Sequence, residues 1–395
     1  MHYDVVIIGA GMSGLAAGLR LAYYDKRVCI VERHYAYGGL NSYYKCSGRE
    51  FDVGLHAVTN YSPPGTRSAP LAKLLRQLRL KFEDLDLHPQ GYSEIRFPSR
   101  TLRFTNDIEV LVSEVAREFP RAVDGFRRLV AHINEYDDTR LEQTYQSARA
   151  VLRDYLGDKE LIEMLLCPMM YYGNADEHDM DFTQFVTIFK GILCEGMARP
   201  RAGIRGIIRV LVKKFRGYGG RIMMGQGVQH INTDGNRATG VTLTSGDTLS
   251  CDTVISSAGY HETMRLCGGA GITAEAMAVG RISFVETIAV LSKLPHELGH
   301  RPTIVFFNDS DTFHYCKPDG MVDLRSGVVC CPSNYTGHED MTEGILRVTW
   351  MANSDCWFGV DETAYRSAKE ACYQHFLTRA AQYIPDFRQH IVFSD

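Results

Sequence analysis

The sequence predicts an α/β fold with two domains, and three features of the chain lead to that prediction. A β-branched apolar run, a glycine-rich turn and a run of good helix formers follow one another at the start. Apolar segments with helical spacing fill the middle, and alternating strand-like runs return after residue 281. At 395 residues the chain is long enough for two domains and a large core.

The composition argues against several classes of protein. With 45% hydrophobic and 23% charged residues, it is that of an ordinary soluble globular protein. The formal net charge of −4 argues against a nucleic-acid-binding surface as the main purpose. No signal-peptide pattern precedes the glycine-rich turn, and no run of about 18 apolar residues could span a membrane. The 11 cysteines are scattered, without a Cys-x-x-Cys pair, which predicts reduced thiols and a cytoplasmic location.

Residues 3–32 form a complete nucleotide-binding pattern. A strand over 3–8 leads into a glycine-rich turn and a helix over 15–22, and a second strand over 28–31 follows. Gly9 permits the tight turn, Gly11 lets a pyrophosphate approach the backbone, and Gly14 lets the helix pack closely on the strand. The helix N-terminus then faces the phosphates. The turn consists of Gly9, Ala10, Gly11, Met12, Ser13 and Gly14.

An acid and a glycine doublet narrow the choice of cofactor. Glu32 ends the second strand, 18 residues after Gly14, and would accept hydrogen bonds from a ribose diol. The doublet Gly38-Gly39 suits a cofactor that continues past its pyrophosphate and needs a second close backbone approach. This favours FAD over NAD. The alternative is a glycine-rich turn in an ordinary βαβ unit.

Further elements follow in order along the chain. A Pro98-Ser99 turn in an alternating segment predicts a hairpin over 91–104. Helices are predicted over 108–118, 123–135, 144–156, 158–170, 182–197 and 200–215. Strands are predicted over 221–224, 227–231, 238–243 and 248–256, and then over 282–291, 303–307, 327–332 and 345–351. A helix over 362–383 and a short strand at 391–393 end the sequence.

These motifs, together with the run Phe51-Asp52-Val53-Gly54-Leu55-His56, resemble the flavin-dependent phytoene desaturase, carotenoid isomerase and retinol saturase family. That family is part of the wider amine-oxidase-like superfamily, and the histidine resembles its isomerase and saturase branch. The resemblance implies a discontinuous Rossmann-type FAD-binding domain of the glutathione-reductase type, plus a substrate domain with a mixed sheet and helices. We expect the FAD-binding domain at 1–85 and 200–270, and the substrate-binding domain at 86–199 and 271–395.

The resemblance also implies the residues that contact the cofactor. Val228 would lend backbone contacts to the adenine, and the segment around Ala258 would lie near the flavin pyrophosphate. The predicted FAD-binding set comprises residues 9–14, Glu32, Arg33, Gly38, Gly39, Leu40, Asn41, His56, Val228 and Ala258.

His56 is the candidate catalytic residue. By its family position it would lie close to the flavin ring, where it could orient a substrate or move a proton near neutral pH. The alternative is a buried histidine satisfied by a backbone carbonyl. Asp52 is interpreted as a local hydrogen-bonding residue that shapes the turn, not as an acid catalyst.

The apolar helices over 161–170 and 182–197, with Phe306, Phe307 and Trp350, could line a slot for an apolar small-molecule substrate. Ordinary core packing explains the same residues at least as well. The helices could also contact a membrane surface peripherally, although Lys190 and Glu195 interrupt their apolar face.

The run His296-Glu297-Leu298-Gly299-His300 fits the zinc-protease pattern H-E-x-x-H. That chemistry requires both histidines on one face of a stable helix. Pro295 and Pro302 bracket the motif and Gly299 lies inside it, which leaves too little room for such a helix. We therefore predict a turn and no metal site.

The predicted function is that of an FAD-dependent oxidoreductase that desaturates, saturates or isomerises carbon–carbon bonds of a polyprenoid or carotenoid-like substrate. A flavin amine oxidase is the nearest enzymatic alternative. A flavin-free lipid or prenyl carrier, or an inactive relative of the same fold, is the alternative from another class. Relatives continue past the strand at 391–393 into a segment that lies against the flavin, so we expect the chain to be a fragment or a shortened relative.

Overall fold

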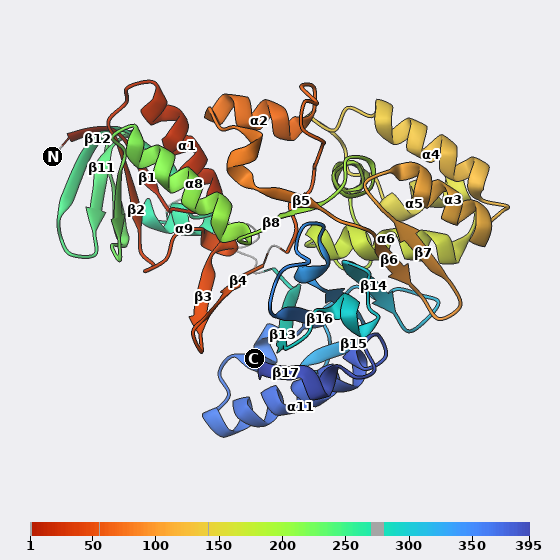
Figure 1. The fold of residues 1–395 in the computed structure, drawn as a ribbon. Coiled ribbons are helices and arrows are strands. Elements are labelled where there is room, and N and C mark those ends of the chain that lie inside the picture. Colours follow the sequence, from red (N-terminus) through yellow and green to blue (C-terminus); the bar gives the residue numbers. More distant parts are fainter. Residues whose placement is uncertain (1, 55, 141, 270–279) are drawn as a thin grey trace. The chain divides into compact units, whose positions relative to one another are not determined.

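The computed structural model describes residues 2–54, 56–140, 142–269 and 280–395. The chain forms two compact units (Figure 1). The first unit comprises Met1–Val58, Pro63–Leu87 and Arg199–Val279, and the second comprises Thr59–Ser62, His88–Ala198 and Gly280–Asp395. The predicted α/β class, with a Rossmann-type part and a mixed sheet, is confirmed.

A six-stranded sheet with the order β10-β11-β12-β1-β2-β9 forms the centre of the first unit. Four neighbouring strands are parallel, with Val6 of β1 opposite Val254 of β12 on one side and Cys29 of β2 on the other. The remaining two strands form antiparallel pairs, β10 with β11 and β11 with β12. The strands are β1 (His2–Ile8), β2 (Val28–Glu32), β9 (Arg221–Met224), β10 (Val228–Asp234), β11 (Arg237–Leu243) and β12 (Thr248–Ser256).

The strands β1 and β2 are mostly apolar and buried, because both faces of this part of the sheet are covered. On one face, Val5 and Ile7 of β1 share a core with residues of three helices, α1 (Met12–Tyr23), α2 (Pro70–Leu78) and α8 (Ile204–Gly217). On the other face, Val6 and Ile8 pack with residues of β10, β11 and β12. Each fully buried aliphatic side chain contributes roughly 1.5–3 kcal/mol, so the two cores together hold the sheet.

Smaller elements complete the first unit. They are the 3₁₀ turns η1 (Gly39–Asn41) and η2 (Phe82–Leu85), the hairpin of β3 (Tyr43–Cys46) and β4 (Arg49–Asp52), and α9 (Tyr260–Leu266). The short strands β5 (Leu87–Pro89) and β8 (Ala198–Pro200) lie where the chain passes from one unit to the other.

The second unit is built on a seven-stranded sheet with the order β17-β13-β16-β15-β14-β6-β7. Only the β14–β6 pair is parallel among its described pairings, so the sheet is mixed, as predicted. One face packs against α11 (Glu362–Ala380). The strands are β6 (Ser93–Arg96), β7 (Thr101–Phe104), β13 (Ser283–Leu291), β14 (Ile304–Asn308), β15 (Val322–Cys330), β16 (Gly344–Ala352) and β17 (Ile391–Ser394).

In the part of this unit that the structure describes, five α-helices lie between β7 and β8, and acidic or hydroxyl side chains cap most of them. Asp107, Ser147, Asp158 and Asp181 each accept a backbone N–H in the first turn of the helix that follows. The helices are α3 (Ile108–Glu118), α4 (Val123–Glu135), α5 (Ala148–Leu156), α6 (Lys159–Gly173) and α7 (Phe182–Phe189). Among the described residues, no helix is both long and apolar enough to cross a membrane.

Several predicted boundaries differ from those observed. The predicted helix over 182–197 divides into α7 and a π turn at Lys190–Cys194. The predicted helix over 200–215 begins only at Ile204, because Gly203 has a left-handed φ of 74°. Residues 59–62, predicted in the FAD-binding domain, belong to the second unit, because Asn60 and Tyr61 donate backbone N–H groups to the carbonyls of residues 191 and 196. The predicted boundary at 270/271 lies outside the described residues.

For two of the apolar residues that could have lined a cavity, the structure supports the alternative of core packing. Phe307 and Trp350 are buried in the core beneath α11, together with Phe376. Phe306 is equally buried. Because successive residues of a strand face opposite sides of the sheet, Phe306 lies on the face opposite to that of Phe307. Core packing therefore explains Phe307 and Trp350.

The H-E-x-x-H run forms a turn. Pro295–Leu298 is a 3₁₀ turn that ends at Gly299 in the left-handed conformation, so His296 and His300 do not share a helix. His300 is buried near Tyr383, with a ring separation of 6.2 Å. Among the described residues, no group of three or more potential ligands could hold a metal ion.

Burial, followed by the positive charge of Arg96, lowers the pKa of His300 from 6.5 to about 4. In the unfolded chain the imidazole takes up a proton near its ordinary pKa, whereas in the folded protein it stays neutral to much lower pH. The unfolded state therefore binds more protons between these values. Above the pKa of the unfolded chain, the neutral ring contributes its full share to the stability. This share is lost as the pH falls from the His300 pKa of the unfolded chain toward that of the folded protein.

We predict that, between pH 7.5 and pH 5, the free energy of unfolding falls by about 2 kcal/mol more in the wild type than in His300→Gln. Urea unfolding at the two pH values measures the difference. His2→Gln, at an exposed histidine, is the control and should keep the wild-type pH dependence. The same pH dependence in wild type and in His300→Gln would contradict the prediction.

Candidate functional site

The predicted cofactor residues gather at one edge of the first unit's sheet. Gly9 follows β1, Glu32 ends β2, and Ala258 lies two residues after β12. Because these three strands are neighbours and parallel, their carboxyl ends lie side by side (Figure 1). Ligands of open α/β sheets bind at this edge.

The glycine-rich turn brings helix and strand into direct backbone contact. Gly9 has a φ of 97°, which glycine adopts without strain. A Cβ atom on Gly14 would lie 2.2 Å from the carbonyl oxygen of Gly9, so no larger residue fits there. In the described part of the chain, no side chain caps the first turn of α1, which leaves that turn suited to an anion.

The glycine doublet makes the second close approach. The backbone N–H of Gly38 donates to the carbonyl of Ala10 at 2.8 Å. A Cβ atom on Gly39 would lie 3.2 Å from the Cα of Gly11. The doublet therefore docks on the glycine-rich turn, and it leads directly into Leu40 and Asn41 of η1. The Leu40 side chain is largely exposed at this edge.

Glu32 is buried, and both of its carboxylate oxygens accept backbone N–H groups. Oε2 accepts from Ala10 at 2.7 Å, and Oε1 accepts from His34 at 2.9 Å. These bonds tie the end of β2 to the glycine-rich turn. A carboxylate has about four acceptor positions, so a ribose diol could still bind, and that role stays a prediction.

The residue before Val228 lies close to Arg33, although the two segments are far apart in the sequence. Gly227 precedes Val228, and a Cβ atom on Gly227 would lie 3.6 Å from the Cβ of Arg33. Val228 and Ala258 both pack against the core formed with β10, β11 and β12. Ser257 precedes Ala258. Its hydroxyl oxygen lies within hydrogen-bond distance of two carbonyl oxygens, those of Ile8 at 3.0 Å and of Gly9 at 3.1 Å.

His56 lies in the loop after β4, and this loop contacts the doublet segment. Gly54 has a φ of 75°, and a Cβ atom there would lie 2.8 Å from the carbonyl oxygen of Leu40. The carbonyl of His56 accepts a hydrogen bond of 2.6 Å from Nη1 of Arg199. The structure thus brings the His56 loop to the residues predicted to hold the cofactor. Its catalytic role stays a prediction.

Asp52 is buried and bonded on several sides, and these partners are distant in the sequence, whereas a local role was predicted. Its carboxylate accepts from Nη2 of Arg199 at 2.6 Å and from Nη1 of Arg205 at 2.9 Å. Neither Arg199 nor Arg205 could be predicted as a partner of Asp52 from the sequence. No local pattern marks them, because they lie 147 and 153 residues from Asp52.

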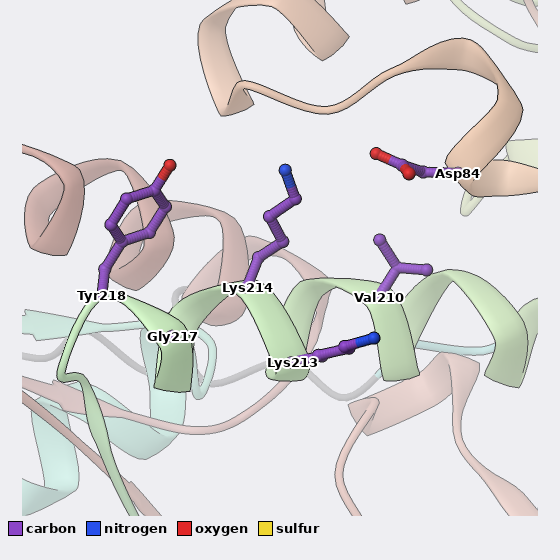
Figure 2. A pocket seen from close by; sticks show the side chains of 6 residues that line it. All are labelled: Asp84, Val210, Lys213, Lys214, Gly217 and Tyr218. Carbon is purple, nitrogen blue, oxygen red and sulfur yellow. The ribbon is translucent and has the colours of Figure 1, made fainter.

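A separate groove of about 360 Å³ lies on the surface of the first unit. Figure 2 shows Lys214 and Tyr218 of α8 and its C-cap pointing into the same space as Asp84. None of the predicted cofactor or catalytic residues lines this groove, so it is distinct from the edge described above.

A family model described as FAD-dependent oxidoreductase matches residues 4–394. Prolycopene isomerase from Arabidopsis thaliana is 24% identical over 66% of this chain and 48% of its own length. The lycopene-forming phytoene desaturase of Pantoea ananas is 25% identical over 66% of this chain and 56% of its own length. The chain thus spans about half the length of these two curated relatives.

Wild-type putrescine oxidase bound to putrescine has a similar structure, with a TM-score of 0.64 at 17% identity. The match covers 100% of this chain and 84% of that one. At this identity the likeness concerns the fold alone.

We predict that Gly14→Ala lowers the free energy of unfolding by roughly 3 kcal/mol, because the new methyl group would collide with the carbonyl of Gly9. Gly217→Ala is the control. It also replaces a helical glycine, but nothing lies within 4 Å of its new methyl group, so its stability should change by less than about 1 kcal/mol. Thermal or chemical unfolding measures both. Equal stability of Gly14→Ala and wild type would refute the close contact.

Proposed function

The chain belongs to the FAD-dependent oxidoreductase family, whose model spans residues 4–394, and we propose that it acts on carbon–carbon bonds of an apolar, polyprenoid substrate. The observation that carries this proposal is its similarity to prolycopene isomerase and phytoene desaturase, joined to the docked pair of glycine segments. The reaction would be desaturation, saturation or isomerisation.

The first unit fits the cofactor at several points. The close backbone approaches at Gly9, Gly11 and Gly39 leave room where a pyrophosphate needs it. Glu32 would accept the ribose hydroxyls, and Arg33 with Val228 would lie at the adenine end. The remaining residues of the proposed set are Ala10, Met12, Ser13, Gly14, Gly38, Leu40, Asn41, His56 and Ala258.

When bound, FAD supplies the acceptor or donor for hydride transfer with a carbon atom. The protein's own part is to position the substrate and to move the proton that balances the hydride. We assign the latter to the imidazole of His56, whose ordinary pKa lies near neutral pH. Apolar surroundings would exclude water from the reacting carbon.

Two other functions are separable from this one. A flavin amine oxidase is supported by the similarity to putrescine oxidase in fold. In that case primary amines, and not polyenes, would reduce the bound flavin. A flavin-free lipid carrier would give a colourless protein that takes up no added FAD. A peripheral membrane contact, which would help collect an apolar substrate, is tested by flotation with lipid vesicles.

We predict that purified wild-type protein is yellow or takes up added FAD, and that Gly11→Val lowers its affinity for FAD at least tenfold. A Cβ atom at Gly11 would meet only the Cα of Gly39, at an ordinary 3.9 Å, so the fold tolerates the change. The side chain would instead occupy the space proposed for the pyrophosphate. Titration with FAD, followed by fluorescence or absorption, measures the affinity.

Gly91→Val, where nothing lies within 4 Å of the new Cβ atom, is the control and should bind FAD as the wild type does. Unchanged FAD binding in Gly11→Val would show that the cofactor lies elsewhere. If the wild type binds FAD, anaerobic photoreduction and reoxidation with polyenes, quinones or oxygen would identify the acceptor.

A further inference from the structure

We propose that Arg199 is a positioning residue, which fixes the main chain of the His56 loop by bridging it to the buried carboxylate of Asp52. The inference rests on the proposed function, in which His56 acts on the substrate. It assigns the placement of His56 to a residue 143 positions further along the chain.

The two ends of one guanidinium group make the bridge. Nη2 of Arg199 donates to Oδ2 of Asp52 at 2.6 Å, and Nη1 donates to the carbonyl oxygen of His56 at 2.6 Å. Both bonds are short and charge-assisted. Because the guanidinium is planar and rigid, its two nitrogens hold the carboxylate and the His56 carbonyl at a set separation.

Asp52 is itself immobilised, so the bridge has a firm anchor. Its carboxylate accepts from Nη1 of Arg205 and, at 3.3 Å, from the backbone N–H of Ile204 at the start of α8. At Gly203, a Cβ atom would lie 2.2 Å from Oδ2 of Asp52, so only glycine at this position leaves room for the carboxylate. The positive end of the α8 dipole adds to its stabilisation.

The other end of the bridge lies in the loop that carries His56. In the same loop, Gly54 packs against the carbonyl of Leu40. Contacts to the segment proposed to hold the cofactor and to Arg199 therefore both help to locate the loop. Losing the contact to Arg199 would let the His56 ring shift relative to the cofactor segment.

Stability alone does not account well for this arrangement. The side chains of Asp52 and Arg199 are only 1% and 7% exposed, and burying charges costs a large desolvation free energy. Apolar residues of similar volume often give equal or greater stability at such positions. What this buried arginine supplies in addition is a defined geometry, because one of its nitrogens donates to the Asp52 carboxylate and the other to the His56 carbonyl.

Arg205 provides a matched comparison, because it shares Asp52 with Arg199 but its second partner is different. Its Nε lies 3.0 Å from Oε2 of Glu50, which is on the hairpin strand β4. Replacing either arginine removes one partner of Asp52. Only replacing Arg199 also removes the bond to the His56 carbonyl.

The first test needs no cofactor. In protein labelled with carbon-13 in its histidine rings, the His56 signal is identified by its loss in His56→Gln. We expect Arg199→Gln to move that signal and change its pH titration, whereas Arg205→Gln leaves both as in the wild type. An unmoved His56 signal in Arg199→Gln, or equal movement in the two variants, would overturn the proposal.

Arg199→Lys covers the case in which Arg199→Gln fails to fold. It keeps the charge beside Asp52 but lacks the planar fork, so it should fold and still move the His56 signal. A folded Arg199→Lys whose His56 signal matches the wild type would overturn the proposal as well.

The second test uses flavin-loaded protein. We expect Arg199→Gln to slow flavin reduction or reoxidation by a polyene at least tenfold. In the His56→Gln background, the same change should add less than twofold, because Arg199 acts through His56. Fully additive effects would contradict the proposal. A wild type that binds no FAD would refute the proposed function, and the histidine signals would still decide the role of Arg199.

Discussion

Backbone packed directly against backbone is the constraint on which the first unit depends. The turn after β1 touches the start of α1 at Gly14, and it receives the glycine doublet through the hydrogen bond from Gly38 to Ala10. Glu32 ties the end of β2 to the same turn. Side chains at these glycine positions would separate three elements at once. The edge proposed to bind FAD can form because these glycines have no side chains.

The part of the site that depends on local geometry could be predicted from the sequence, and the part that depends on distant pairing could not. Gly9, Gly14 and the doublet could be recognised in the sequence, because glycines at this spacing indicate tight turns and close backbone packing. The partners of Asp52 carry no such mark. Arginines are common on surfaces, and nothing in the run around Arg199 says that it is buried. Only the folded chain brings it to Asp52.

The same limit appears in the second unit. Alternating apolar runs predicted its mixed sheet, because a strand has a period of two whatever it packs against. The period does not say which face meets a helix and which meets a cavity. Phe307 and Trp350 were therefore open to both interpretations until α11 was located over them. The π turn after α7 had no signal either, since its residues continue the apolar helical pattern.

The discontinuous build of the first unit has a consequence for synthesis on the ribosome. β1 pairs with β12, and His2 lies opposite Ser250, so one neighbour of the first strand is the last strand of this sheet to be translated. At about 5–20 residues per second, β1 waits roughly 10–50 s for this partner. Meanwhile the helices between β7 and β8 can form from local contacts. During that interval the nascent chain exposes an unpaired apolar strand edge, the kind of surface that chaperones bind.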